Sequence, residues 1–394
     1  MSPITVHLIA AARPNFMKIA PLYHALANES WCKPMIVHTG QHYDANMSDA
    51  FFRDLQLPSP HFHLEVGSGS HAEQTGGVMI AYEKVAVREK PDWIVVVGDV
   101  NSTAACAMVG TKLWIPVIHL EAGLRSGDRR MPEEINRLVT DAISDVLWTP
   151  SPDADENLAR EGVSPGQIDR VGNIMIDSFE MMRAAIEADD TRDSLGLRPN
   201  DYAVVTLHRP SNVDRRVDLE PLVQQLVAVS RDLPFVFAVH PRTRKKLEEF
   251  GLLEALTATS STLTPTSSTL SHAGVGEGAR RAGEGSGARI RLTEPLGYIQ
   301  FMNLVRSARA VITDSGGVQE ESTYLGIPCL TLRENTERPI TVTEGSNRLV
   351  RAENLFAQVQ EVLKGHWATG RRPALWDGRT AARCVVALKR RAGI

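Results

Sequence analysis

Short apolar runs alternate along this chain with longer stretches of helical periodicity. Residues 93–97 are apolar at every position, which is typical of a parallel strand covered on both faces. Gly98 and Asp99 follow this run, and the small residues of 102–113 then predict a helix. The same reading predicts strands at 6–9, 35–38, 115–120, 202–207, 235–239, 310–313 and 328–332, and helices at 16–28, at 219–231 and up to Leu325. This alternation indicates an α/β protein with parallel sheets.

The alternation starts again after Gly172, which predicts two doubly wound domains with a hinge near 172–178. We expect an N-terminal Rossmann-like domain at 1–172 and a second one at 173–370. Residues 257–288 interrupt the second domain and are rich in Ser, Thr, Gly and Ala. Such a composition predicts a flexible insertion, which is either a tolerated surface loop or a lid or partner-binding segment.

Composition limits the classes of function. The chain has 394 residues, 43% of them hydrophobic, and a net charge of −4. This charge gives no general case for nucleic acid or an anionic membrane as a partner. No apolar run approaches the length of a membrane span, and the N-terminus does not resemble a signal peptide, so the cytoplasm is the expected location. The four cysteines are isolated in the sequence and are expected to be free thiols.

Polar side chains follow the predicted strands where ligands bind in open α/β sheets, at the carboxyl ends. They are Arg13 and Lys18 after the first strand, Asp99, Glu121, His208 with Arg209, and the run from Ser315 to Gly317. Each is weak evidence alone. Together they predict one polar site at the edges of both sheets.

Ser315, Gly316 and Gly317 introduce the predicted helix that ends at Leu325. Glycines let a backbone approach an anion closely, and the N-terminus of a helix presents free N–H groups and the positive end of its dipole. The motif therefore suits a diphosphate, although a plain tight turn explains many such triplets. Glu321 on the same helix could hold ribose hydroxyls, or simply face solvent.

Asp99, Glu121 and Glu133 could supply the acid and base of a proton transfer, for which burial and neighbours tune a carboxyl group. In isolation Asp99 could equally cap a helix. Glu133 and Glu134 could equally favour the N-terminus of a helix that begins after Pro132, and this explanation is stronger for Glu134. His208 could bind phosphate or move a proton, or be a structural histidine. The histidine spacing supports no metal site, and no G-x-G-x-x-G motif supports a nicotinamide cofactor.

Several motifs in order make the chain resemble the non-hydrolysing UDP-N-acetylglucosamine 2-epimerase family. The motifs are Arg13 to Leu22, Thr39 to His42, Val97 to Asp99, His119 to Arg125, Pro132 to Arg137, Val171 to Asn173, Leu207 to Arg209, Thr313 to Glu321 and Thr336 to Pro339. The resemblance runs to about Val350. It implies the GT-B architecture, with two Rossmann-like domains around a central cleft and a C-terminal helix, in 371–394, that packs back on the N-terminal domain.

The resemblance also implies roles. It assigns UDP binding to Arg13, His208, Ser315, Gly316, Gly317, Glu321 and Arg338, and catalysis to Asp99, Glu121 and Glu133, with Lys18 near the reacting groups. It implies that UDP is eliminated to leave a 2-acetamidoglucal and then added back, with no cofactor. It further implies a possible activator site for a second UDP-sugar at Gln41, His42 and Arg209, and a role in polysaccharide biosynthesis. We expect the protein to form a homodimer.

Three departures from the family pattern leave the sugar and the activation open. They are the short basic segment between Gly127 and Pro132, the Arg209-Pro210-Ser211-Asn212 sequence, and the 257–288 insertion. Alternatives are a hydrolysing 2-epimerase, a 2-epimerase of a UDP-diacetamido-uronic acid, and a GT-B glycosyltransferase. A sensor of UDP-sugars without catalysis would not need the three carboxylates.

Overall fold

The computed structural model of the protein describes residues 2–40, 54–257, 290–368 and 370–394. Its first sheet has the strand order β3-β2-β1-β4-β5-β6-β7 and its second the order β10-β9-β8-β11-β12-β13. All recorded strand pairs are parallel. In each sheet the chain adds strands first on one side of its first strand, β1 or β8, and then on the other side, so the strand order reverses once, as in Rossmann-like sheets. The predicted fold class, α/β with two Rossmann-like domains, is therefore confirmed.

The first sheet uses residues up to Arg170. Its strands are β1 (Ile4–Ala10), β2 (Cys32–His38), β3 (Phe62–His63), β4 (Trp93–Val97), β5 (Val117–Leu120), β6 (Val146–Thr149) and β7 (Ile168–Arg170). The helices between them are α1 (Arg13–Ala27), α3 (His71–Glu89), α4 (Asn101–Lys112), α5 (Pro132–Ile143) and α6 (Pro152–Arg160), with a 3₁₀ turn η1 (Pro165–Gln167). β4 pairs with both β1 and β5 and is buried almost throughout, as its continuous apolar sequence predicts.

The second sheet begins after a connection made by α7 (Ile174–Ala188) and α8 (Thr191–Ser194). Its strands are β8 (Ala203–Thr206), β9 (Phe235–Ala238), β10 (Ile290–Thr293), β11 (Ala310–Thr313), β12 (Cys329–Thr331) and β13 (Asn347–Leu349). The remaining elements are α9 (Pro210–Val213), α10 (Arg216–Asp232), α11 (Pro241–Glu249), α12 (Leu253–Thr257), α13 (Tyr298–Val305), α14 (Gly316–Leu325), α15 (Ile340–Thr343), η2 (Ala352–Asn354), α16 (Leu355–Leu363) and α17 (Thr380–Arg391).

Two helices begin earlier than the sequence reading predicts. α1 begins at Arg13 rather than at Phe16, because Pro14 suits the first turn of a helix and the Asn15 side chain accepts a hydrogen bond from the Ala12 amide at 3.0 Å. α10 begins at Arg216. The predicted insertion at 257–288 lies outside the described residues, apart from Thr257.

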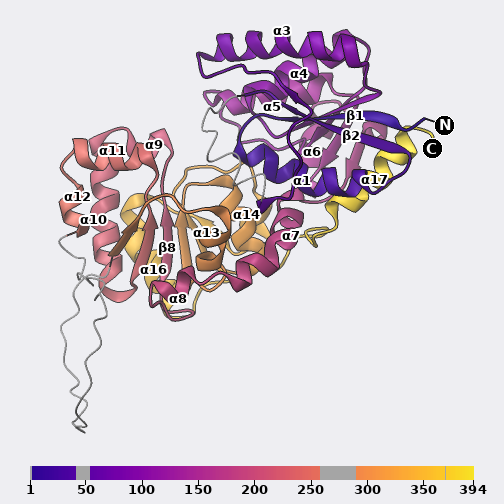
Figure 1. Cartoon of the computed structure of the whole chain (residues 1–394). Coiled ribbons are helices and arrows are strands. Elements are labelled where there is room, and N and C mark those ends of the chain that lie inside the picture. The colour runs from indigo at the N-terminus through magenta and orange to yellow at the C-terminus, as the bar shows by residue number, and fades with distance from the viewer. Residues whose placement is uncertain (1, 41–53, 258–289, 369) are drawn as a thin grey trace, which may run out of the picture.

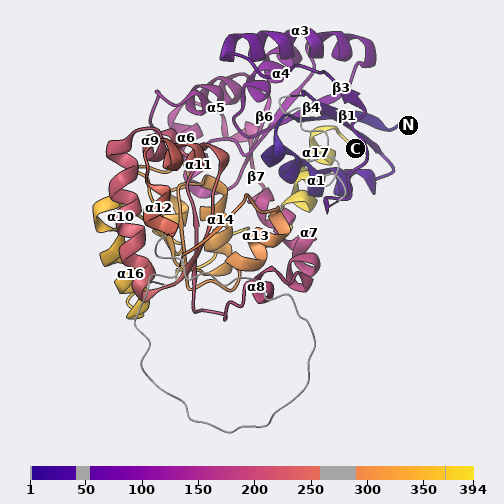
Figure 2. The same ribbon diagram turned by 60° about the vertical axis from the view of Figure 1, so that its left-hand side comes forward.

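The C-terminal helix α17 lies against α1 and α7, so that the two chain ends are close together in both views of the ribbon (Figures 1 and 2). Asp177 of α7 fixes the start of α17, because its carboxylate accepts hydrogen bonds from the Thr380 and Ala381 amides at 3.0 and 2.8 Å. The Trp376 indole donates to the Pro150 carbonyl at 3.1 Å. The chain thus leaves the second sheet and ends on the first domain.

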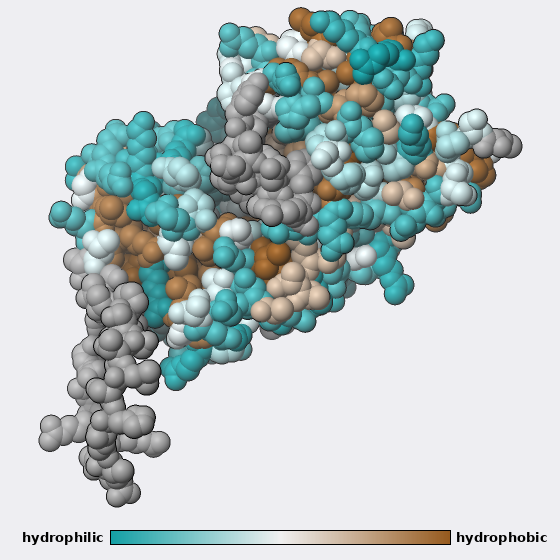
Figure 3. All heavy atoms as spheres, in the orientation of Figure 1, coloured by the Kyte–Doolittle hydropathy of each residue, from teal (hydrophilic) through white to brown (hydrophobic). Residues whose placement is uncertain are grey.

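The surface visible in Figure 3 is mainly polar, with apolar residues at the top over α3. Ile80 and Val87 of α3 are 63% and 55% exposed, and Trp114, just after α4, is 94% exposed. None of the helices that the structure describes is long and apolar enough to cross a membrane. The four cysteines are free and buried, as predicted.

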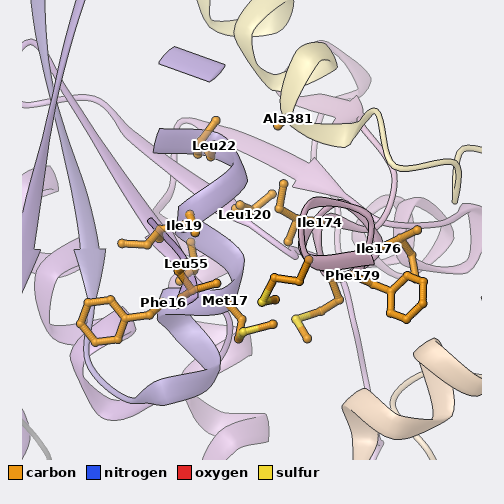
Figure 4. Close-up of a cluster of buried hydrophobic side chains, with 14 of the residues drawn as sticks. Phe16, Met17, Ile19, Leu22, Leu55, Leu120, Ile174, Ile176, Phe179 and Ala381 are labelled. Carbon is orange, nitrogen blue, oxygen red and sulfur yellow. The ribbon is translucent and has the colours of Figure 1, made fainter. Parts of the chain in front are cut away.

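One hydrophobic cluster runs through α7 from the first sheet to the second, including Leu8 of β1 and Val204 of β8. Figure 4 shows its centre, where residues of α1 face residues of α7. The labelled side chains are Phe16, Met17, Ile19, Leu22, Leu55, Leu120, Ile174, Ile176, Phe179 and Ala381. Gly172 lies just before α7 and has a φ of +98°. A Cβ at this position would lie 2.3 Å from the Leu375 carbonyl oxygen, so the junction between the domains requires glycine.

Candidate functional site

Four of the predicted site residues lie where the strand order of a sheet reverses. α1 follows β1 and carries Lys18, while Asp99 follows β4, the neighbour of β1 on the other side of the reversal. His208 follows β8, and Ser315 follows β11, which are neighbours in the second sheet. These are the positions where ligands bind in open α/β sheets.

Glu121 lies at the centre of the candidate site. Its carboxylate pairs with the ammonium of Lys18, and its Oε1 accepts a hydrogen bond from Nη2 of Arg338 at 2.7 Å. Burial opposes ionisation of Glu121, but the charges of Lys18 and Arg338 outweigh that effect and lower its pKa. Glu121 therefore stands as a buried carboxylate between two cations, one from each domain.

The backbone at Glu121 has a φ of +76°, a left-handed conformation that a non-glycine residue rarely adopts. Hydrogen bonds from the Glu121 and Ala122 amides to the Trp148 carbonyl, at 3.0 and 3.1 Å, hold it there. Such strain persists only where the surroundings fix it, and it gathers at functional sites. At Gly98, a Cβ would lie 3.1 Å from the Lys18 ammonium, so glycine makes room for the cation.

Arg338 is buried and joins three carboxylates. Besides Glu121 it pairs with Glu320 at 2.9 Å and with Glu337 at 3.1 Å. A Cβ on Gly316 would lie 2.8 Å from a guanidinium nitrogen of Arg338, so this glycine makes room for an arginine. By contrast, a Cβ on Gly317 would meet no heavy atom within 4 Å, so there is open space beside this glycine at the start of α14.

Glu320 and Glu321 of α14 are both buried carboxyl groups. The Asn173 side chain donates to Oε1 of Glu320 at 2.9 Å, and the Tyr298 hydroxyl donates to Glu321 at 2.7 Å. Burial raises the pKa of Glu320 to about 7 and that of Glu321 to about 8. Glu321, the predicted ribose ligand, is therefore not a solvated helix residue.

Asp99 is held by an ion pair with Arg137 of α5. Arg137 is 2% exposed and also pairs with Glu134 at 2.6 Å. Glu134 in turn accepts the Ser126 and Gly127 amides at 2.9 and 3.0 Å, and so holds the loop before α5. Glu134 thus has a structural role.

Glu133 is exposed in the first turn of α5. Among the described residues, the structure places it in none of the ion pairs that gather Lys18, Glu121 and Arg338. The catalytic role of Glu133 stays a prediction.

His208 and Arg209 are organised by Asp314 at the end of β11. The Asp314 carboxylate accepts the amides of both residues, at 3.1 and 2.9 Å, and pairs with Nδ1 of His208 at 2.9 Å. Burial opposes ionisation of Asp314, but its hydrogen bond with His208 and the charge of that ring lower its pKa. The His240 ring lies beside His208, with 5.7 Å between centroids.

Three predicted residues cannot be placed. Gln41 and His42 of the possible activator site lie outside the described residues, as does the side chain of Arg13 at the start of α1. Arg209, the third residue of that site, donates to the Asp314 carbonyl at 3.1 Å and lies 3.4 Å from Glu337. The Ser315 amide donates to the Thr313 hydroxyl at 3.0 Å where α14 begins.

The sequence reading did not single out several residues that the structure brings into the site: Arg137, Asn173, Asp314, Glu320 and Glu337. All of them lie within the motifs that carry the family resemblance. Arg137 and Glu320 lie on helices, so their burial depends on helix register. Asn173, Asp314 and Glu337 lie between elements, and their contacts depend on which segments the fold brings together, which these short motifs do not reveal.

Comparison with known proteins now identifies the family. The family model described as UDP-N-acetylglucosamine 2-epimerase matches residues 24–389. The chain belongs to this family. It is 41% identical over 371 residues to the UDP-N-acetylglucosamine 2-epimerase of Methanocaldococcus jannaschii, covering 91% of this chain and 93% of that one. The family that the motifs predict is thereby confirmed.

One solved structure and one further relative bear on the site. A solved structure of the Methanocaldococcus jannaschii UDP-GlcNAc 2-epimerase, in complex with UDP-GlcNAc and UDP, superposes with a TM-score of 0.83 at 38% identity and covers 98% of this chain and 100% of that chain. A UDP-2,3-diacetamido-2,3-dideoxy-D-glucuronate 2-epimerase from Pseudomonas aeruginosa is 37% identical, with 87% of each chain covered. The 2-epimerase family thus includes relatives named for two different sugars.

Proposed function

We propose that the protein catalyses reversible epimerisation at carbon 2 of UDP-N-acetylglucosamine to give UDP-N-acetylmannosamine. The observation that carries the proposal is the buried Lys18–Glu121–Arg338 cluster at the carboxyl end of the first sheet, where the charge of Asp99 also acts on Arg338. The fold, the family and the relative solved with UDP-GlcNAc and UDP support a UDP-sugar substrate. We propose an N-terminal domain at 1–172, a C-terminal domain at 173–370, and a C-terminal helix within 371–394 that packs back on the N-terminal domain.

The proposed reaction begins with an elimination. A carboxylate takes the proton from carbon 2, the bond between carbon 1 and the diphosphate oxygen breaks, and a 2-acetamidoglucal with a double bond between carbons 1 and 2 remains. Return of a proton to the opposite face of carbon 2, with attack of the diphosphate oxygen on carbon 1, gives the epimer. The reaction is redox-neutral and needs proton-transfer groups on both faces, for which we propose Asp99, Glu121 and Glu133.

The leaving diphosphate carries the charge that must be stabilised. We assign it to Arg13, His208 and Arg338 and to the amides at Ser315, Gly316 and Gly317, with Glu321 on the ribose. Arg338 is already a buried cation, and the N-terminus of α14 is open at Gly317. Charged donors and helix N-termini that are fixed before reaction stabilise such a leaving group without reorganisation.

Proton NMR of the protein with UDP-N-acetylglucosamine in deuterated water tests the proposal. We expect a growing UDP-N-acetylmannosamine signal and uptake of deuterium at carbon 2, without added metal or nucleotide cofactor. Free UDP with free N-acetylmannosamine would instead establish the hydrolysing reaction. Transfer of the sugar only when an acceptor is added would establish a glycosyltransferase.

The Pseudomonas aeruginosa relative favours a second candidate, a UDP-diacetamido-uronic acid as substrate. The short segment of Asp128, Arg129 and Arg130 supports it, because a uronate adds a carboxylate that a cation could bind. The same NMR experiment with each substrate separates the two. A higher kcat/KM for the uronic acid would overturn the first choice.

We further propose a homodimer located in the cytoplasm, in polysaccharide biosynthesis, with a second UDP-sugar as activator near Gln41, His42 and Arg209. The apolar side chains of Ile80, Val87 and Trp114 are exposed in the single chain, which supports a dimer that buries this surface. Light scattering on the purified protein measures the molar mass. A monomeric mass at all concentrations would exclude the dimer, and hyperbolic saturation by substrate would argue against activation.

A further inference from the structure

His119 of β5 is a buried titratable group that the proposed reaction does not use. Its side chain is fully buried, and both ring nitrogens lie against oxygen atoms. Nε2 lies 2.8 Å from the Gly98 carbonyl oxygen, and Nδ1 lies 2.5 Å from Oδ1 of Asp141 on α5. Which ring nitrogens of such a histidine carry hydrogen depends on whether its two partners accept or donate hydrogen bonds.

Both partners are acceptors. A backbone carbonyl oxygen accepts only, so Nε2 carries a hydrogen. Asp141 accepts the Gly123 amide at 3.0 Å and pairs with Arg125 at 2.7 Å. The Arg125 guanidinium and the Gly123 N–H both favour the ionised form of Asp141, so this carboxylate accepts from Nδ1 as well. Hydrogen bonds to two acceptors require a hydrogen on each ring nitrogen, and a ring that carries both hydrogens is an imidazolium.

The two hydrogen bonds of His119 reach the two loops that carry the candidate catalytic carboxylates. The Gly98 carbonyl belongs to the peptide that leads into Asp99. Through Asp141, the ring is connected to the Gly123 amide, two residues after the strained backbone of Glu121. One buried side chain thus links the ends of β4 and β5 at the site.

We propose that His119 is a positioning residue of the reaction, an imidazolium between two acceptors that fixes the Asp99 and Glu121 loops relative to each other and adds positive charge beside Glu121. This inference rests on the proposed function of those two carboxylates. It assigns no contact between His119 and the substrate.

The charge effect can be separated from the effects of the other groups. Glu121 faces Lys18 from α1 and Arg338 from the second domain, and Glu320 of α14 lies beyond Arg338. After burial and the effects of Lys18 and Arg338, the charge of His119 is a further cause that lowers the pKa of Glu121. Loss of the imidazolium would make Glu121 easier to protonate while Lys18 and Arg338 stay in place.

Nitrogen-15 NMR of the histidine side chains in the ligand-free protein tests the charge directly. At neutral pH we expect both ring nitrogens of His119 to carry hydrogen, with assignment by loss of the signals in His119→Gln. His7 is the internal comparison, because it is also fully buried but its pKa is lowered to about 4 by burial, so one of its nitrogens should be bare. A bare nitrogen on His119 would overturn the proposal.

The pH dependence of epimerisation tests the role. In His119→Gln we expect the acidic limb of kcat/KM to move up by about half to one pH unit, because Glu121 needs a higher pH to ionise. His7→Gln, a matched buried histidine outside the site, should leave the limb where it is. An equal loss of activity at every pH, with an unmoved limb, would show that His119 only supports the fold and would overturn the proposal.

The two measurements separate two kinds of failure. If the wild-type protein does not epimerise the UDP-sugar, the proposed function fails, while the ring-nitrogen measurement still decides whether His119 is charged. If His119→Gln does not fold, the signals of His119 are assigned by selective labelling of the wild type, and a bare nitrogen there still overturns the inference.

Discussion

The guanidinium of Arg338 donates a hydrogen bond of 2.7 Å to the carboxylate of Glu121, although 217 residues separate the two in the chain. Arg338 comes from the second domain and Glu121 from the first. A diphosphate bound at the start of α14 would compete with Glu121 for this cation. Binding of UDP would then leave Glu121 with Lys18 alone, and so connect occupancy of one domain with the charge balance of the other.

Glu121→Gln tests the central carboxylate. We expect turnover to fall by about 10²–10⁴-fold, because the amide cannot exchange a proton with carbon 2. UDP affinity, measured by calorimetry, should be retained or increase, because the cations remain and Arg338 loses a competing carboxylate. Glu83→Gln, an exposed carboxyl on α3, is the control and should keep full turnover. Unchanged turnover in Glu121→Gln would remove this residue from the mechanism.

Arg338→Met tests the cost of removing the shared cation. Within the described residues, Glu320 loses its only ion-pair partner, Glu121 loses one of two and Glu337 loses one of three. We expect the free energy of unfolding to fall by about 3 kcal/mol or more, because carboxylates remain buried without a partner.

The matched control is Arg371→Met, which breaks the exposed pair with Glu344 and should cost less than about 1 kcal/mol. Urea denaturation measures both variants. Equal stability of the two variants would mean that water or protonation compensates for the loss of Arg338.

Glu321→Gln tests a buried acid. The folded state holds the proton up to about pH 8, whereas the unfolded chain loses it near the ordinary value of 4.5. Between these values the folded state binds more protons, so this group makes stability fall as pH rises. Gln keeps an acceptor for Tyr298 and does not titrate. The free energy of unfolding of Glu321→Gln, relative to that of wild type, should therefore increase by about 2 kcal/mol between about pH 6 and about pH 8.

Urea unfolding at the two pH values measures the difference for Glu321→Gln. The exposed Glu353→Gln serves as control and should show no such growth. A parallel pH dependence of wild type and Glu321→Gln would show that Glu321 is ionised in the folded protein.

Much of the site follows from the sequence because parallel strands present their carboxyl ends at one edge. Lys18, Asp99 and Glu121 come from three segments, and the strand pattern alone gathers them at the carboxyl ends of the neighbouring strands β1, β4 and β5. The same reasoning gathers His208 and Ser315 in the second sheet. These predictions need only the strand order, which is the usual one for such sheets.

The remaining features depend on helix register and on how the domains meet. Successive helix residues differ by about 100° around the axis, so Glu133 faces solvent while Glu134 turns inward to Arg137. The pairing of Arg338 with Glu121 needs the placement of one domain on the other, which no local pattern contains. For the same reason the burial of Glu320 between Arg338 and Asn173 could not be predicted.

Deletion of residues 260–286 tests the predicted insertion. Leu256 and Ile290, on either side, are both buried in the core of the second domain, and α12 contacts β10, so a short link can join them. We expect a folded protein with epimerase activity and a thermal midpoint within a few degrees of wild type, since loop length costs little stability. An unfolded product, seen by circular dichroism, would show that the segment is part of the fold.

Asp314→Asn tests the group that organises His208 and Arg209. Asp314 is fully buried and also accepts the Asn212 side chain at 3.0 Å. Asn keeps one acceptor oxygen but turns an N–H₂ group toward donors, so the loop after β8 should loosen. We expect UDP to bind about tenfold more weakly by calorimetry and stability to fall by about 1–3 kcal/mol, the cost of unpaired buried groups. Asp218→Asn, which alters an exposed pair with Arg215, should leave both unchanged. If Asp314→Asn lost stability but bound UDP as tightly as wild type, the order that Asp314 imposes on His208 and Arg209 would serve the fold rather than the ligand.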